Sequence, residues 1–112
     1  MAHYLLQISY TPEAWAALVR NPQDRAEAVR GPIENLGGKT ERIWLAFGED
    51  DIVGVIEMPN NVAAAAISMA FSAGGACRRV KTTPLLSFQE GIDAMKKASQ
   101  CGYKPAHKTA SA

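Results

Sequence analysis

Apolar and polar residues alternate through the first ten positions of the chain. Alternation with a period of two predicts a strand over residues 3–10 with one buried side. The expected buried side carries Tyr4, Leu6, Ile8 and Tyr10, and the opposite side carries His3, Leu5, Gln7 and Ser9.

Three further strands are predicted, two of them joined at the middle of the chain. Residues 39–47 and 52–58 flank the polar segment Gly48–Asp51, whose composition is typical of a tight hairpin turn. Alternation along residues 39–47 places Glu41, Ile43, Leu45 and Phe47 on one side, and Thr40, Arg42, Trp44 and Ala46 on the other. A fourth strand is expected from Cys77 to about Ser87, where Pro84 favours an edge position.

Helical periodicity fills the intervals between these strands. Thr11-Pro12 has the chemistry of a helix start, and the helix that follows should bury a stripe made of Trp15, Leu18 and Val19. Asn21-Pro22 repeats this start signal for a second helix that reaches Gly37-Gly38. Gly31-Pro32 predicts a kink or break within it, because proline removes one backbone hydrogen bond.

Two more helices complete the chain. Asn60 or Asn61 caps an alanine-rich helix over residues 62–73, and Ser87–Glu90 is a capping box for the last helix. The resulting order, β-α-β-β-α-β followed by an extra helix, predicts an α+β ferredoxin-like fold. Its four-stranded antiparallel sheet would carry the two main helices on one face. We expect one domain over residues 1–102 and a flexible basic tail over residues 103–112.

The alanine-rich helix bears on association. Ser68 and Ser72 are its only polar side chains within residues 62–73, so it lacks the wide charged face of a helix that is exposed on one side. We expect a second copy of the chain to cover it, in a homodimer or a higher homo-oligomer. The alternative is that small alanine side chains are left in water.

A series of short motifs resembles the GYD-domain family. These motifs lie within residues 3–88 and are Tyr4-Leu5, Tyr10-Thr11-Pro12-Glu13, Leu36-Gly37-Gly38-Lys39, Gly48-Glu49-Asp50-Asp51-Ile52-Val53, Pro59-Asn60 and Val80-Lys81-Thr82-Thr83. Asp50 occupies the position that is usually tyrosine in the motif that gives the family its name. The resemblance implies a ferredoxin-like domain of the dimeric α+β barrel superfamily, found in bacteria and archaea, and it implies no established activity.

Composition and charge narrow the classes of function. Twelve Lys and Arg residues nearly balance eleven Asp and Glu residues, so no nucleic-acid partner is expected. No apolar stretch is long enough for a membrane helix and no secretory signal is visible, so a cytoplasmic location is expected. Cys77 and Cys101 lack metal-type spacing and are interpreted as reduced thiols. The sequence predicts neither a metal site nor a cofactor.

Five residues are candidates for a site, each with a simpler alternative. His3 and Asp51 are the catalytic candidates, since histidine titrates near neutral pH and Asp51 is one of two adjacent carboxylates. The alternatives are a histidine without a chemical role and a solvated turn made by Asp50 and Asp51. Trp44, Arg42 and Leu5 are the ligand-binding candidates, and packing between subunits is the alternative for Trp44.

Two hypotheses of function follow. The first is a small homo-oligomeric α+β domain that binds a small, mostly apolar ligand between sheet and helices. The second is a cofactor-independent enzyme, similar to monooxygenases or isomerases of the dimeric α+β barrel type, and it rests on analogy of fold.

Overall fold

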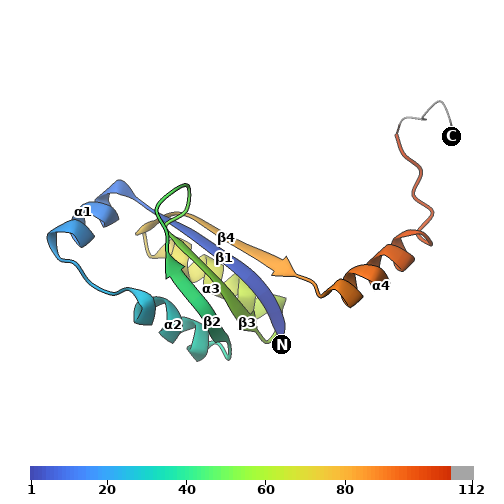
Figure 1. Ribbon diagram of the computed structural model, residues 1–112, viewed down its shortest axis with the longest axis horizontal. Helices are drawn as coiled ribbons and strands as arrows, with labels where there is room; N and C mark the ends of the chain where they lie inside the picture. Colours follow the sequence, from blue (N-terminus) through green and yellow to red (C-terminus); the bar gives the residue numbers. More distant parts are fainter. Residues whose placement is uncertain (107–112) are drawn as a thin grey trace.

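The first strand lies in the interior of the sheet and organises the rest of the molecule. The computed structural model describes residues 1–106 and is shown in Figure 1. Strand β1 (Ala2–Tyr10) pairs antiparallel with both β3 (Ile52–Met58) and β4 (Cys77–Leu85). Strand β2 (Lys39–Leu45) pairs antiparallel with β3, so the strand order is β2-β3-β1-β4. The predicted α+β ferredoxin-like sheet is confirmed, and Pro84 lies on an edge strand as expected.

Two helices cover one face of this sheet. Helix α2 (Ala26–Asn35) lies along β2, and helix α3 (Asn61–Ala73) packs on β4 and β3. Between these helices and the sheet lies a core that includes all four residues predicted for the buried side of β1. Its members are Tyr4, Leu6, Ile8, Tyr10, Val29, Ile33, Ile52, Ile56, Met58, Ala64 and Ile67. The alternation along β1 therefore identified the correct buried face.

The caps of the helices explain where they begin. The Thr11 hydroxyl accepts a hydrogen bond from the backbone N–H of Ala14 at the start of helix α1 (Pro12–Arg20), as the sequence predicts. Asn60 caps α3 in the same way by accepting from the N–H of Ala63. Ser68 of α3 contacts Thr82 on the sheet, so it belongs to the inner side of the helix and not to an outer polar stripe.

Helix α2 differs from the sequence prediction in two respects, its first residue and the predicted kink or break at Gly31-Pro32. It begins at Ala26 and not at Asn21-Pro22. The Asp24 carboxylate accepts a hydrogen bond from the backbone N–H of Ala26. It also continues through Pro32 without a break. The N–H that Pro32 lacks would have bonded to the carbonyl of Ala28, and Ala28 is exposed, so water can satisfy that carbonyl.

The connection between β2 and β3 is longer than the predicted turn. Strand β2 ends at Leu45, so the loop comprises residues 46–51 and leaves Phe47 in solvent. A bulge between Thr40 and Arg42 makes Glu41 an extra residue in the strand. Arg42 and Trp44 then face the uncovered side of the sheet with Leu5, because Arg42 pairs with Val55 and Val55 with Leu5. Glu41 lies on that side too, and its predicted grouping with Ile43 is wrong.

Gly54 lies where β2 and β3 approach closely. A Cβ atom at this position would lie 2.6 Å from the carbonyl oxygen of Arg42. Only glycine therefore fits opposite the segment that follows the bulge without moving the backbone.

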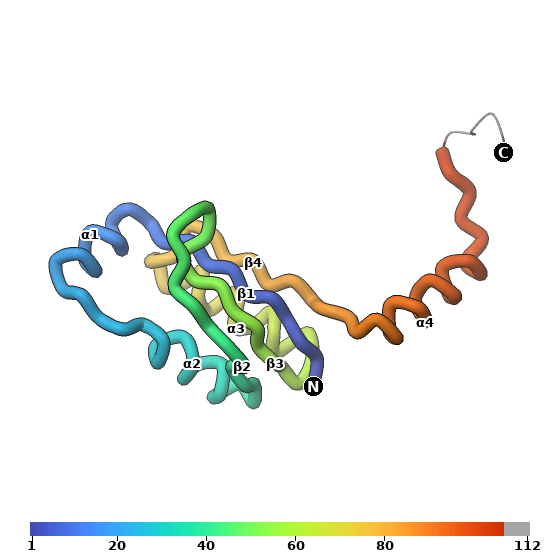
Figure 2. Tube along the Cα trace, viewed as in Figure 1, coloured from blue at the N-terminus to red at the C-terminus, as the bar shows by residue number. Residues whose placement is uncertain are grey.

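The C-terminal helix α4 (Phe88–Ala98) extends away from the rest of the molecule, as Figures 1 and 2 show. Its capping box is confirmed: Ser87 accepts from the N–H of Glu90, and the Glu90 carboxylate accepts from the N–H of Ser87. None of its residues is buried. The radius of gyration is 18.3 Å, against about 13 Å for a compact domain of this length. Helix α4 therefore does not cover the open face of its own sheet.

Two features concern the limits of the domain. Residues 103–106 form no helix or strand, and the remainder of the predicted tail lies outside the described residues. Within residues 1–106, no helix has the length and apolar character needed to cross a membrane.

Candidate ligand-binding site

A cavity of about 650 Å³ opens between α1, the segment of residues 21–25 that joins α1 to α2, and the adjoining end of the sheet. It lies on the side of the sheet that carries the helices. Its apolar lining includes Tyr10, Trp15, Leu18, Ile43, Leu45 and Ile52, and Asp24 and Arg25 contribute polar groups. The cavity exists because α1 does not close against the core as α2 and α3 do.

The helix α1 stripe was predicted to be buried, and the structure corrects this. Trp15 and Leu18 are only partly buried, and Val19 is 74% exposed. All three residues line the cavity. The periodicity thus identified the apolar side of the helix, but it did not predict that this side faces a cavity and not a packed core.

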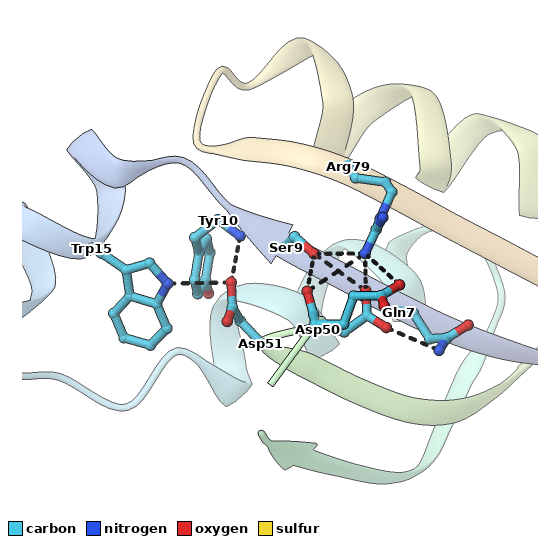
Figure 3. A network of polar contacts seen from close by, with 8 residues as sticks. Gln7, Ser9, Tyr10, Trp15, Asp50, Asp51 and Arg79 are labelled. Carbon is cyan, nitrogen blue, oxygen red and sulfur yellow. Dashed lines mark hydrogen bonds and ion pairs between the residues drawn. The ribbon is translucent and has the colours of Figure 1, made fainter. Parts of the chain in front are cut away.

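Asp51 fixes the aromatic wall of the cavity. Its Oδ2 atom accepts a hydrogen bond of 2.8 Å from the backbone N–H of Tyr10 and one of 3.2 Å from the indole Nε1–H of Trp15, as Figure 3 shows. The rings of Tyr10 and Trp15 meet edge to face, with centroids 5.5 Å apart. One carboxylate therefore ties the start of β3 to the end of β1 and orients α1.

The polar end of the cavity contains a cation beside a phenol. Burial raises the pKa of the Tyr10 hydroxyl, and the nearby Arg25 guanidinium acts in the opposite direction. Burial also raises the pKa of the Cys77 thiol, again opposed by Arg25. Within residues 1–106, no carboxylate lies within 4.0 Å of the Arg25 guanidinium. Its Nη1 atom donates to Gln23 Oε1 at 3.4 Å, and the guanidinium has further donors that can bind a ligand.

Asp50 points to the opposite side of the sheet from Asp51. Its carboxylate accepts hydrogen bonds from Arg79 Nη2 at 2.9 Å, Gln7 Nε2 at 3.1 Å and Ser9 Oγ at 3.2 Å (Figure 3). The Arg79 guanidinium lowers the pKa of the Asp50 carboxyl, and the hydrogen bond from Ser9 acts in the same direction. The two adjacent carboxylates therefore bind different sets of partners and do not act as a pair. The expectation of a merely solvated turn is wrong, because each carboxylate binds residues far away in the sequence.

The predicted ligand-binding residues lie mainly on the open face. Arg42 places its guanidinium carbon 4.9 Å from the centroid of the Trp44 ring, a cation–π contact. Leu5 is two strands away across Val55 on the same face. Trp44 also contributes to the wall of the cavity, because β2 is the edge strand there.

The GYD domain family matches residues 4–95, which include most of β1, most of α4 and every helix and strand between them. The chain belongs to the GYD domain family. No curated protein matches the chain.

In this GYD domain, the two catalytic candidates are not brought together. Asp51 directly precedes β3, whereas His3 pairs with Glu57 near the other end of that strand. The Asp51 carboxylate accepts hydrogen bonds from Tyr10 and Trp15 and thereby fixes these two residues of the cavity wall. The structure therefore gives Asp51 a positioning role that the hairpin sequence does not indicate.

Apart from Trp44, the residues that line the cavity are not among the ligand-binding candidates that the sequence indicates. Tyr10 lies in the core as predicted and also lines the cavity, whereas the helical spacing of Trp15 and Leu18 predicts core positions alone. The sequence pattern does not single out Arg25. The sequence does offer one signal, since residues 21–25 are polar and carry a proline between two helices, which is typical of a segment that holds those helices apart.

Proposed function

We propose that this GYD domain binds a small, mostly apolar molecule in the cavity between α1 and the sheet. The observation that carries the proposal is the cavity of about 650 Å³ with its aromatic and aliphatic wall. Sites for small molecules usually enclose about 300–1,000 Å³ and combine an apolar lining with a few polar groups. The Trp15 ring, oriented by Asp51 and Tyr10, supplies a rigid surface for a flat ligand.

Arg25 suggests the chemistry of the ligand's polar end. A guanidinium group recognises a carboxylate through paired hydrogen bonds, and such charge-assisted bonds are stronger than neutral ones. Asp24 also lines the cavity and reduces the net positive charge there. We therefore favour an aromatic or branched apolar molecule that carries a single anionic group.

The test uses naphthoate as the probe and a variant that fills the cavity. Ala26 lines the cavity at the start of α2, whereas Ala28 is exposed on the same helix and does not line it. Ala26→Phe should weaken naphthoate binding by about tenfold or more, and Ala28→Phe should leave it unchanged. Quenching of the fluorescence of Trp15 and Trp44, which both line the cavity, and chemical-shift changes measure the binding. Equal affinity in the two variants, or no saturable binding to the wild-type protein, contradicts the proposal.

Arg25→Gln tests recognition of the anionic group separately from recognition of the apolar part of the ligand. It should weaken binding of naphthoate by roughly tenfold, because a charge-assisted hydrogen bond is lost, and leave the uncharged methyl naphthoate unaffected. An equal loss for both probes would show that Arg25 only shapes the cavity, which contradicts the anionic part of the proposal.

The working form of the domain, in our proposal, is a homo-oligomer in which α4 of one copy packs against another copy. Phe88 of α4 is 96% exposed, and Ile92 and Met95 continue the same apolar stripe. The open face of the sheet offers Leu5, Val53 and Val55 beside Trp44. A short helix with such an apolar stripe is stable when the stripe is covered. Because α4 extends away from its own sheet, it can reach a second copy without folding back onto its own chain.

Sedimentation of the full chain at low micromolar concentration tests the assembly. Replacing Phe88 and Met95 by Ser should convert the oligomer to a folded monomer. Replacing Gln89 and Lys96 by Ser alters the neighbouring side of α4 by the same number of residues and should leave the mass unchanged. A wild-type protein that sediments as a folded monomer contradicts this part of the proposal.

A further inference from the structure

Three side chains that can bind metal ions meet at one corner of the open face, away from the cavity. They are His3 of β1, Glu41 of β2 and Glu57 of β3. His3 Nε2 lies 3.4 Å from an Oε1 atom of Glu41 and 4.0 Å from Oε1 of Glu57. One ligand atom from each residue lies within 4.8 Å of those from the other two.

The strand register explains why the three residues converge. His3 and Glu57 are directly opposite each other in the β1–β3 pair, so their side chains leave the same face of the sheet. Glu41 is the extra residue of the β2 bulge. Without the bulge, alternation would send Glu41 to the side of Ile43, toward the helices. The bulge thus supplies the third side chain, and bulges often redirect a side chain beside a functional site.

We propose that His3, Glu41 and Glu57 bind a divalent transition-metal ion such as Zn²⁺. One imidazole nitrogen and two carboxylate oxygens are ligands that Zn²⁺, Mn²⁺ and Fe²⁺ accept, and two carboxylates balance the charge of the ion. Ligand atoms about 2.0–2.2 Å from a metal are roughly 3–3.5 Å from one another. The His3–Glu41 pair already has this separation, and Glu57 needs only a small rotation of its side chain to match it.

The geometry also indicates the kind of site. The side chains of His3, Glu41 and Glu57 are 46%, 37% and 18% exposed. Three protein ligands with an exposed outer side leave a coordination position for water or a second ligand, as in catalytic sites and unlike closed structural ones. Each ligand comes from a different strand, so no spacing motif announces the site in the sequence.

Other charges near the three residues influence the affinity. Lys39 is opposite Glu57 in the β2–β3 register, so its positive charge on this strand pair opposes the binding of a cation. Glu90 at the start of α4 is close enough for the His3 charge to act on it, so it adds a further carboxylate nearby. Without metal, protonated His3 would form ordinary ion pairs with its two glutamates, and the experiment has to separate these two arrangements.

Zinc titration of the untagged full chain tests the proposal. A His107→Gln, Cys101→Ser background removes the second histidine and the exposed thiol. His3 is then the only histidine of the sequence, so every imidazole signal comes from it. Isothermal titration should give one Zn²⁺ per chain, and the His3 ring signals should shift in the NMR spectrum at the same ratio. Glu57→Gln and Glu41→Gln should each weaken binding by about tenfold or more, because each removes a charged ligand.

Matched controls distinguish a built site from general attraction to carboxylates. Glu34→Gln removes an exposed carboxylate of α2 and should leave Zn²⁺ affinity unchanged. Ala26→Phe, which fills the cavity, should also leave it unchanged, so the two proposals fail independently. The metal site is refuted if Zn²⁺ binds equally to Glu57→Gln and wild-type chains, or if millimolar Zn²⁺ leaves the His3 signals in place.

Discussion

The two faces of the sheet are made by the same strands and differ in what covers them. On one face, residues such as Leu6, Ile8 and Ile56 are buried beneath α2 and α3. On the other face, no helix of residues 1–106 lies over the strands, and partly buried Leu5 and Val55 alternate with ionisable groups. The covered face holds the molecule together, and the open face carries the charged side chains.

This difference follows from the cost of burying charge. A charged group beneath α2 or α3 would lose its water without gaining a partner, so that face carries uncharged residues, and its polar Ser68 and Thr82 contact each other. The open face has no such restriction and can hold Asp50, His3 and Glu57 together with their partners. The cavity lies where the covered face ends, because α1 leaves the sheet there only partly covered.

The largest expected effect comes from shortening a side chain on the covered face. Ile56→Ala removes a fully buried side chain from the centre of the sheet and should lower the free energy of unfolding by about 2–5 kcal/mol. Its neighbour Val55 faces the other side, and Val55→Ala should cost only about 1 kcal/mol. Urea denaturation of both variants measures the difference. Equal losses would mean that the open face is as well packed as the covered one.

A smaller effect is expected at the junction of the two faces. Asp51→Ala leaves the Tyr10 N–H and the Trp15 indole without an acceptor and should cost about 2 kcal/mol. In a Trp44→Phe background, which leaves Trp15 as the only tryptophan of the sequence, the emission should shift to longer wavelength as the ring becomes mobile. Glu49→Ala is the control, since its exposed carboxylate makes only a 3.5 Å ion pair with Arg79 and should change stability by under about 1 kcal/mol. An unshifted Trp15 spectrum in Asp51→Ala would contradict the positioning role.

The secondary-structure elements and the covered face could be predicted from sequence because their signals are local and periodic. The alternation along β1, the caps at Thr11 and Asn60 and the capping box at Ser87 each depend on residues close together in the chain. The ferredoxin-like order follows from these elements, and the GYD domain match agrees with the motifs along the chain.

The sites were harder to predict because they depend on long-range geometry. A bulge shifts the alternation by one residue at Glu41, and the hydrophobic pattern contains no sign of it. The partners of Asp50 come from β1 and β4, which no inspection of the hairpin reveals. Trp15 and Leu18 have the spacing of core residues. Whether α1 packs them against the sheet depends on the conformation of residues 21–25, which connect α1 to α2.

The smallest expected effect depends on pH and belongs to Asp50 on the open face. Because Arg79 lowers the pKa of Asp50 in the folded state, the unfolded chain binds more protons and stability rises with pH. The contribution of Asp50 is complete above its unfolded pKa of about 4 and is lost as pH falls through the lower folded pKa. Asp50→Asn should therefore lower the melting temperature by a few degrees at neutral pH, and this difference should narrow steadily in acid. A difference that stays constant down to the lowest pH would mean that the Asp50 hydrogen bonds, and not its charge, stabilise the loop against the open face.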